Sequence, residues 1–200
     1  MVAAGAITTQ HALKTISFHL PVNPEILSKL KTELASAMPI AGRLASLQEL
    51  EKLPYLSAVI SEGLRISHSV SSRLSRVSPE NPIMIGKHEI PPRTPVSMTS
   101  VLVHENPDIF PEPRQFKPER WLQGNSNGRL DRYLVPFSKG TRACLGINLA
   151  YAEMYLTLAA VFHRFDLELY ETTREDIEVT HDFFNPSVKL DSKGVRALVK

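Results

Sequence analysis

Proline sets the outline of this sequence, because it occurs fifteen times in 200 residues. Proline fixes φ and lacks a backbone N–H, so it is tolerated in the first turn of a helix and disrupts a helix interior. Pro21 therefore ends a helix predicted over residues 2–20, whereas Pro24 and Pro54 begin the helices that follow. Prolines recur with little periodicity through residues 106–136, which predicts a long irregular segment there.

Apolar residues spaced by three and four predict the helices between the prolines. Asn23 is expected to cap the second helix, and Ser46 and Glu49 have the spacing of a capping box. Residues 54–67 carry one apolar face, as an amphipathic helix does. The strongest helical pattern covers residues 147–164, within "CLGINLAYAEMYLTLAAVFHRF".

From Ser71 onward the apolar period shortens toward two, which predicts short strands. They are expected in "SRLSRVS" (72–78), "PIMIGKHEIP" (82–91), "TPVSMTSVLVH" (94–104), "DLELY" (166–170) and "VKLDSKGVRALV" (188–199), the last with a turn at 192–194. We therefore predict a mainly α-helical fold with small β-sheets, of the α+β class, without repeats or a linker.

Charge and cysteine content exclude several classes of protein. The net charge is +2, from 23 basic and 21 acidic residues without a basic block, so nucleic acid is not an expected partner. A single cysteine excludes an internal disulfide and leaves no zinc-binding spacing. No apolar run approaches the ~20 residues of a membrane span, and no secretory signal is apparent. We expect a protein that is intracellular or faces the cytosol.

The one cysteine, Cys144, lies in "FSKGTRACLG" between Gly140 and Gly146. A lone cysteine is usually a small buried hydrophobic residue. Here the glycines allow a tight turn, and a helix expected to begin at or just after Cys144, together with Arg142, favours the metal-binding thiolate. A nucleophilic cysteine is an open alternative, but it needs an activating histidine, and the nearest in sequence, His163, lies 19 residues further on. A c-type haem link needs CxxCH, which is absent.

This loop matches all four fixed elements of FxxGxRxCxG and resembles the haem-binding loop of the cytochrome P-450 family. The resemblance implies that Cys144 is the axial thiolate ligand of haem b, an iron protoporphyrin IX. It implies that Phe137 packs under the porphyrin and that Arg142 contacts a haem propionate. Gly140 is the fixed glycine of the loop, which spans residues 137–146.

Glu62 and Arg65 in "EGLR", and Arg120 in "PERW", resemble the ExxR and PxRx motifs of the same family. Taken alone, the pair three residues apart would be an exposed ion pair of little energetic weight. The resemblance implies instead a buried structural triad that ties the helix at 54–67 to the segment 106–136.

"AGAITT", at residues 4–9, resembles the oxygen-binding helix of the family, expected here over residues 1–20. Ala4 and Gly5 would leave room for dioxygen, and Thr8 would hydrogen-bond it and help deliver protons. Taken alone, the small residues would indicate close helix packing and Thr8 an ordinary helix threonine. Ile7 stands where the family has an acidic residue, so proton delivery would use water or another group, or be impaired.

Arg76 matches the family's arginine that reaches a haem propionate, and the side chains around Ser69–Ser72 would line the substrate pocket. Without the resemblance, Arg76 would be a solvated residue of a strand. The resemblance covers residues 1–200 and implies the C-terminal portion of a single domain, which begins inside the oxygen-binding helix and ends in strands over residues 165–200. Such a portion is expected to bind haem loosely.

The resemblance implies a haem-thiolate monooxygenase that uses O2, a small hydrophobic organic substrate and electrons from an NADPH-dependent flavoprotein reductase. The sequence resembles fungal members associated with secondary, often terpenoid, metabolism. A full-length form would lie at the cytosolic face of the endoplasmic reticulum membrane, and this chain alone in the cytoplasm. Two alternatives stay open: a haem-thiolate isomerase or dehydratase that needs no reductase, and a non-catalytic haem-binding remnant.

Overall fold

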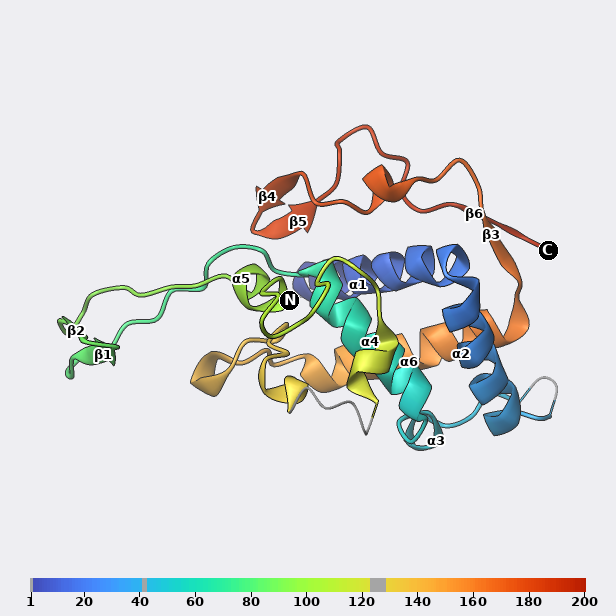
Figure 1. Cartoon of the computed structure of the whole chain (residues 1–200), viewed down its shortest axis with the longest axis horizontal. Coiled ribbons are helices and arrows are strands. Elements are labelled where there is room, and N and C mark those ends of the chain that lie inside the picture. Colours follow the sequence, from blue (N-terminus) through green and yellow to red (C-terminus); the bar gives the residue numbers. More distant parts are fainter. Residues whose placement is uncertain (1, 41–42, 123–128) are drawn as a thin grey trace.

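The structure is a computed structural model that describes residues 2–40, 43–122 and 129–200. Four helices form its centre (Figure 1). They are α1 (Val2–Val22), α2 (Pro24–Ala37), α4 (Pro54–Ser67) and α6 (Ile147–Arg164). All four contribute to one apolar core, which includes Ile16, Leu20, Leu30, Leu34, Leu56, Ile60, Met154, Leu158 and Phe162. Burial of this surface is the main stabilising contribution to the fold.

Shorter elements surround these helices. The short helices are α3 (Leu47–Leu50) and α5 (Ser100–His104), and the 3-10 turns are η1 (Pro118–Trp121), η2 (Leu130–Arg132), η3 (Gly140–Arg142) and η4 (Arg174–Asp176). Three antiparallel pairs join β1 (Ile83–Ile85) to β2 (His88–Ile90), β3 (Leu167–Leu169) to β6 (Ala197–Val199), and β4 (His181–Phe183) to β5 (Asn185–Ser187). In Figure 1 the β1–β2 hairpin projects away from the helices. The predicted α+β class is confirmed.

Helix α1 does not end at Pro21 as predicted; it includes Pro21 and ends at Val22. Proline in the last turn removes only one backbone hydrogen bond, so the helix tolerates it there. The Asn23 Nδ2 donates to the carbonyl oxygen of His19 at 2.7 Å. Asn23 therefore closes α1 rather than capping α2 with its side chain, although Pro24 begins α2 as predicted.

The observed bounds of helix α4 are those expected. Its first N–H groups are satisfied by α2: both carboxylate oxygens of Glu33 accept hydrogen bonds, from the Tyr55 and Leu56 N–H groups, at 2.8 Å each. Its last turn is followed by His68 in the left-handed region (φ 49°). The capping box of Ser46 and Glu49 before α4 is also confirmed.

Gly63 allows α1 and α4 to approach closely. A Cβ at this position would lie 2.1 Å from Cγ1 of Ile16, which is fully buried. Any larger residue at 63 would therefore displace the Ile16 side chain or separate the helices.

Three strand predictions are wrong. Residues 72–78 form no strand and contribute only Arg76 to an isolated bridge. Residues 94–104 form one bridge, between Val96 and Arg76, followed by helix α5, which is capped by the Thr99 hydroxyl accepting from the Val101 N–H. Residues 188–199 do not fold back on themselves, since β6 pairs with β3 instead. The β4–β5 hairpin was not predicted.

None of the described helices combines the length and hydropathy needed to cross a membrane.

Candidate functional site

A buried ion cluster fills the junction between α4 and the segment that follows α5. Glu62 and Arg65 are fully buried, and Arg120 is 9% exposed. The Arg65 Nε and Nη2 donate to the two Glu62 oxygens at 3.0 and 2.8 Å, and the Arg120 Nε donates to Glu62 Oε1 at 3.1 Å. The predicted triad is therefore confirmed, and the alternative of an exposed pair is wrong.

Main-chain and indole groups complete this cluster. The Trp121 Nε1–H donates to Glu62 Oε2 at 2.9 Å, and the Lys117 N–H donates to Glu62 Oε1 at 2.9 Å. The guanidinium groups donate in turn to four carbonyl oxygens, those of His104, Pro111, Glu112 and Gln115. Because these carbonyls belong to residues 104–115, the cluster fixes an otherwise irregular proline-rich segment against α4. Residues 123–128 of the predicted segment 106–136 lie outside the described residues.

The cysteine loop is the opposite of this cluster in exposure. Residues 139–146 are all exposed, including Arg142 and Cys144. The Cys144 N–H donates to the carbonyl oxygen of Phe137 at 2.9 Å. Phe137 is half-buried, and the centroid of its ring lies 5.3 Å from that of the Tyr151 ring in α6. Helix α6 begins at Ile147, three residues after Cys144, and spans the predicted residues 147–164.

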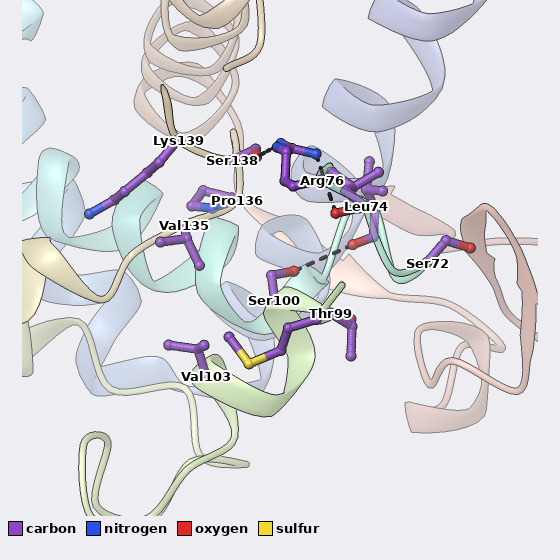
Figure 2. A pocket seen from close by; sticks show the side chains of 12 residues that line it. Ser72, Leu74, Arg76, Thr99, Ser100, Val103, Val135, Pro136, Ser138 and Lys139 are labelled. Atoms are coloured by element: carbon purple, nitrogen blue, oxygen red, sulfur yellow. Dashed lines mark hydrogen bonds between the residues drawn. The ribbon is translucent and has the colours of Figure 1, made fainter. Parts of the chain in front are cut away.

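Arg76 is brought next to this loop. Its Nη2 donates to Ser138 Oγ at 2.8 Å, across 62 positions of sequence, and Figure 2 shows the guanidinium directed toward Ser138. A cavity of about 260 Å³ opens beside this pair, between residues 70–76, 98–103 and 135–139. Arg76 is therefore held against Ser138, the residue that follows Phe137 in the chain.

The predicted residues of α1 lie on a helix that packs against α6. Gly5 and Ile7 are exposed, Thr8 is half-buried, and the side chain of Ala4 is outside the described residues. A Cβ at Gly5 would meet no atom within 4 Å, so space is open on that face of α1. Ile7 is 47% exposed and offers no titratable group there.

The residues of the cysteine loop, together with Arg76, fit a haem. The thiol of Cys144 is accessible, and a Cβ at Gly140 or Gly146 would meet no atom within 4 Å, so nothing of the described chain covers the loop. Arg76 and Arg142 supply cations that suit carboxylate groups. The accessible thiol can supply the thiolate that ligates a haem iron, and the arginines can pair with its propionates.

Three residues of this region were missed by sequence reasoning. Trp121 and His104 belong to the hydrogen-bond network around Glu62, and Ser138 orients Arg76. Trp121 follows "PER" directly, which was a signal within the motif. His104 and Ser138 gave no signal, because their partners are 31 or more positions away.

The sequence profile of the cytochrome P-450 family matches residues 1–193 of this chain. The chain therefore belongs to the cytochrome P-450 family, whose members are haem-thiolate proteins. The resemblance stated from the motifs is confirmed.

Among curated relatives, the chain is 51% identical to cytochrome P-450 monooxygenase sdnE of Sordaria araneosa, over all of this chain and 39% of that protein. It is 48% identical to N-acetyltryptophan 6-hydroxylase ivoC of Emericella nidulans, over 98% of this chain and 39% of that protein. It is 46% identical to tryptophan 6-hydroxylase fscE of Fusarium equiseti, over all of this chain and 39% of that protein. The chain thus spans about two fifths of the length of these fungal relatives.

Proposed function

We propose that this chain holds the haem of a monooxygenase that inserts one oxygen atom of O2 into a small organic substrate. The observation that carries the proposal is the accessible Cys144 in a loop of matching motif, in which Ser138 accepts a hydrogen bond from Arg76. When bound, a haem with a thiolate ligand supplies electron density that favours cleavage of the O–O bond.

The chain's own residues would bind and orient this group. Cys144 would ligate the iron, and Gly140 would let the backbone approach the ring without a side chain in the way. Phe137 would lie against the porphyrin near the sulfur. Arg76 and Arg142 would each pair with a propionate, which fixes the rotation of the ring within the site.

On α1, Gly5 and Ala4 would leave room for dioxygen, and Thr8 would hold a proton at its Oγ1 beside that space. Open space at Gly5 supports this role. The side chains after α4, Ser69–Ser72, would contribute to a substrate site. Relatives named as tryptophan hydroxylases support an aromatic amino-acid derivative as one substrate class to test. Terpenoids, which the resemblance of the motifs implies, are the second class to test.

We also propose that electrons come from an NADPH-dependent flavoprotein reductase, with the protein at the cytosolic face of the endoplasmic reticulum. A second candidate, a haem-thiolate isomerase or dehydratase, is favoured by Ile7, since an exposed isoleucine cannot relay protons. Consumption of NADPH that depends on both reductase and substrate supports the monooxygenase, and conversion of an oxygenated substrate without NADPH supports the isomerase.

The first test is spectroscopic. The chain is reconstituted with haem, reduced and exposed to carbon monoxide, and the position of the Soret band is measured. We expect the strongly red-shifted band of a thiolate-ligated haem, which Cys144→Ser should abolish. Thr141→Ser, at an exposed and unspecified position of the same motif, serves as the matched control and should keep it.

An unchanged red-shifted band in Cys144→Ser would remove the ligand assignment. The same mutant should unfold at the wild-type urea concentration, because an exposed thiol contributes little to the free energy of unfolding.

A further inference from the structure

We propose that His104 is a positioning residue for the cysteine loop, connecting the buried ion cluster to the chain that precedes Cys144. The proposal rests on the function proposed above, since it takes that loop as the part that holds the haem. It concerns a residue outside all the motifs of the sequence.

His104 uses both its main chain and its ring. It ends α5 and is fully buried. Its carbonyl oxygen accepts from Arg65 Nη1 at 2.9 Å, and its ring Nε2 accepts from the Val135 N–H at 3.0 Å. One residue is therefore bonded to α4 on one side and, on the other, to the chain two positions before Phe137.

Val135 is where this connection enters the loop. The Ser138 N–H donates to the Val135 carbonyl oxygen at 3.1 Å, closing a turn. Ser138 has a φ of 59°, a left-handed conformation that is strained for a residue other than glycine, and its Oγ accepts from Arg76. The Phe137 carbonyl in turn accepts from the Cys144 N–H. A displacement of Val135 would therefore move the partner of Arg76 and the partner of Cys144 together.

The hydrogen bond to Val135 requires a neutral ring. Nε2 accepts only when the proton resides on Nδ1, because a protonated imidazole donates from both nitrogens. Burial, and then the nearby His68 and Arg65, lower the pKa of His104 to about 3. The Glu105 carboxylate contacts the His68 Nε2 at 3.3 Å, and the Phe110 ring packs against the His104 ring at an interplanar angle of 85°. His104 therefore remains an acceptor at neutral pH.

Two substitutions separate the acceptor from the ring. His104→Phe keeps a planar ring in the buried space and removes the acceptor. His104→Gln removes the ring and keeps an amide oxygen that can reach the position of Nε2. A packing role predicts that phenylalanine is the milder change, whereas the positioning role predicts that glutamine is.

The deciding measurement is amide hydrogen exchange on the cofactor-free chain. In His104→Phe we expect the Val135 amide to exchange about tenfold faster than in the wild type, as for the loss of one hydrogen bond. Amides of Ile60 and Leu64, inside α4, should keep their wild-type rates. In His104→Gln the Val135 amide should return close to its wild-type rate. The controls are His88→Phe and His88→Gln, at an exposed position of β2, which should change nothing.

Haem retention is the second measurement. After reconstitution and gel filtration, His104→Phe should retain several-fold less haem than His104→Gln. Wild-type exchange at Val135 in His104→Phe, or equally fast exchange in both variants, overturns the proposal. Should His104→Phe not fold, His104→Gln alone decides: protection of Val135 supports the proposal and its loss overturns it. A wild-type chain that binds no thiolate-ligated haem refutes the proposed function, while the exchange rates still decide the role of His104.

Discussion

The ion cluster around Glu62 and the loop around Cys144 are both dense in polar groups, yet their surroundings are opposite. The carboxylate of Glu62 is fully buried and receives five hydrogen bonds from the chain itself. The loop residues 139–146 are exposed, and among the described residues no side chain bonds to the Cys144 sulfur.

This difference separates the two kinds of motif. A group whose partners all lie within the chain contributes to folding, and its removal leaves buried charges unpaired. A reactive group with no partner inside the chain contributes little to folding and is available to a ligand. Mutations should therefore divide into those that change stability and those that change binding.

The largest effect is expected for Glu62→Ala. It leaves Arg65 and Arg120 buried and facing each other without the carboxylate, which costs about 3–5 kcal/mol in the free energy of unfolding. Urea unfolding monitored by circular dichroism measures it. Glu89→Ala, at an exposed position of β2, is the control. A fully stable Glu62→Ala protein would mean that the cluster and the loop do not differ as described.

The second effect is expected from low pH, which should reduce the free energy of unfolding through histidines in the interior rather than through the cysteine loop. Burial is the largest cause that lowers the pKa of His11 and His19 to about 4, and that of His104 to about 3. In the unfolded chain these histidines bind protons below about pH 6.5, whereas in the folded chain they stay neutral until the pH approaches their lowered pKa values. The free energy of unfolding is therefore highest above pH 6.5. It falls as the pH decreases toward 4, by at most about 1.4 kcal/mol per pH unit for each histidine.

Urea unfolding at pH 7, 6 and 5 measures this slope. His19→Phe should reduce it by the share of one histidine, and phenylalanine can keep the stacking on Phe116, whose ring lies 4.8 Å away. A free energy of unfolding that is constant between pH 7 and 5 would contradict the assignment.

A glycine in the core and a glycine in the cysteine loop should likewise differ in their effects on stability and on haem binding. Gly63→Ala places a Cβ 2.1 Å from Ile16 Cγ1, so we expect a loss of about 1–3 kcal/mol from overpacking. Gly146→Ala meets no atom within 4 Å and has a negative φ, so its folding stability should be close to that of the wild type. Haem affinity should show the reverse order, with the larger loss in Gly146→Ala than in Gly63→Ala. Thermal unfolding and haem titration of both variants give the comparison.

The smallest effect is expected at the surface. Lys29 and Glu119 form an ion pair whose side chains are 53% and 39% exposed. Because solvent and salt screen such a pair, Lys29→Met should leave the unfolding midpoint within experimental error. A clear loss of stability would place this pair with the buried cluster.

Local signals predicted the four long helices and the ion cluster around Glu62. Apolar periodicity placed α4 and α6, and prolines at first positions placed α2 and α4, because both signals act within a single turn of helix. The ExxR and PxRx motifs led to the triad, since each motif is short and its spacing is fixed.

The errors have a common cause. Residues 94–104 alternate like a strand, but a strand needs a partner along its length, and only Val96 finds one. At β6 the partner is β3, nearly thirty positions earlier, rather than the neighbouring residues. His104 was missed for the same reason, since its partners Arg65 and Val135 are distant in sequence. Pairing across the chain is decided by tertiary packing, which a local pattern does not contain.

The carboxylate of Glu33 has a consequence for the order in which this chain folds. Helix α4 has no side-chain cap of its own, and its first N–H groups are satisfied only once α2 has docked. The loop to be closed is short, since 22 positions separate Glu33 from Tyr55, so this docking is entropically inexpensive. We therefore expect α2 and α4 to form the folding nucleus together, and Glu33→Gln to slow refolding in stopped-flow experiments more than it accelerates unfolding.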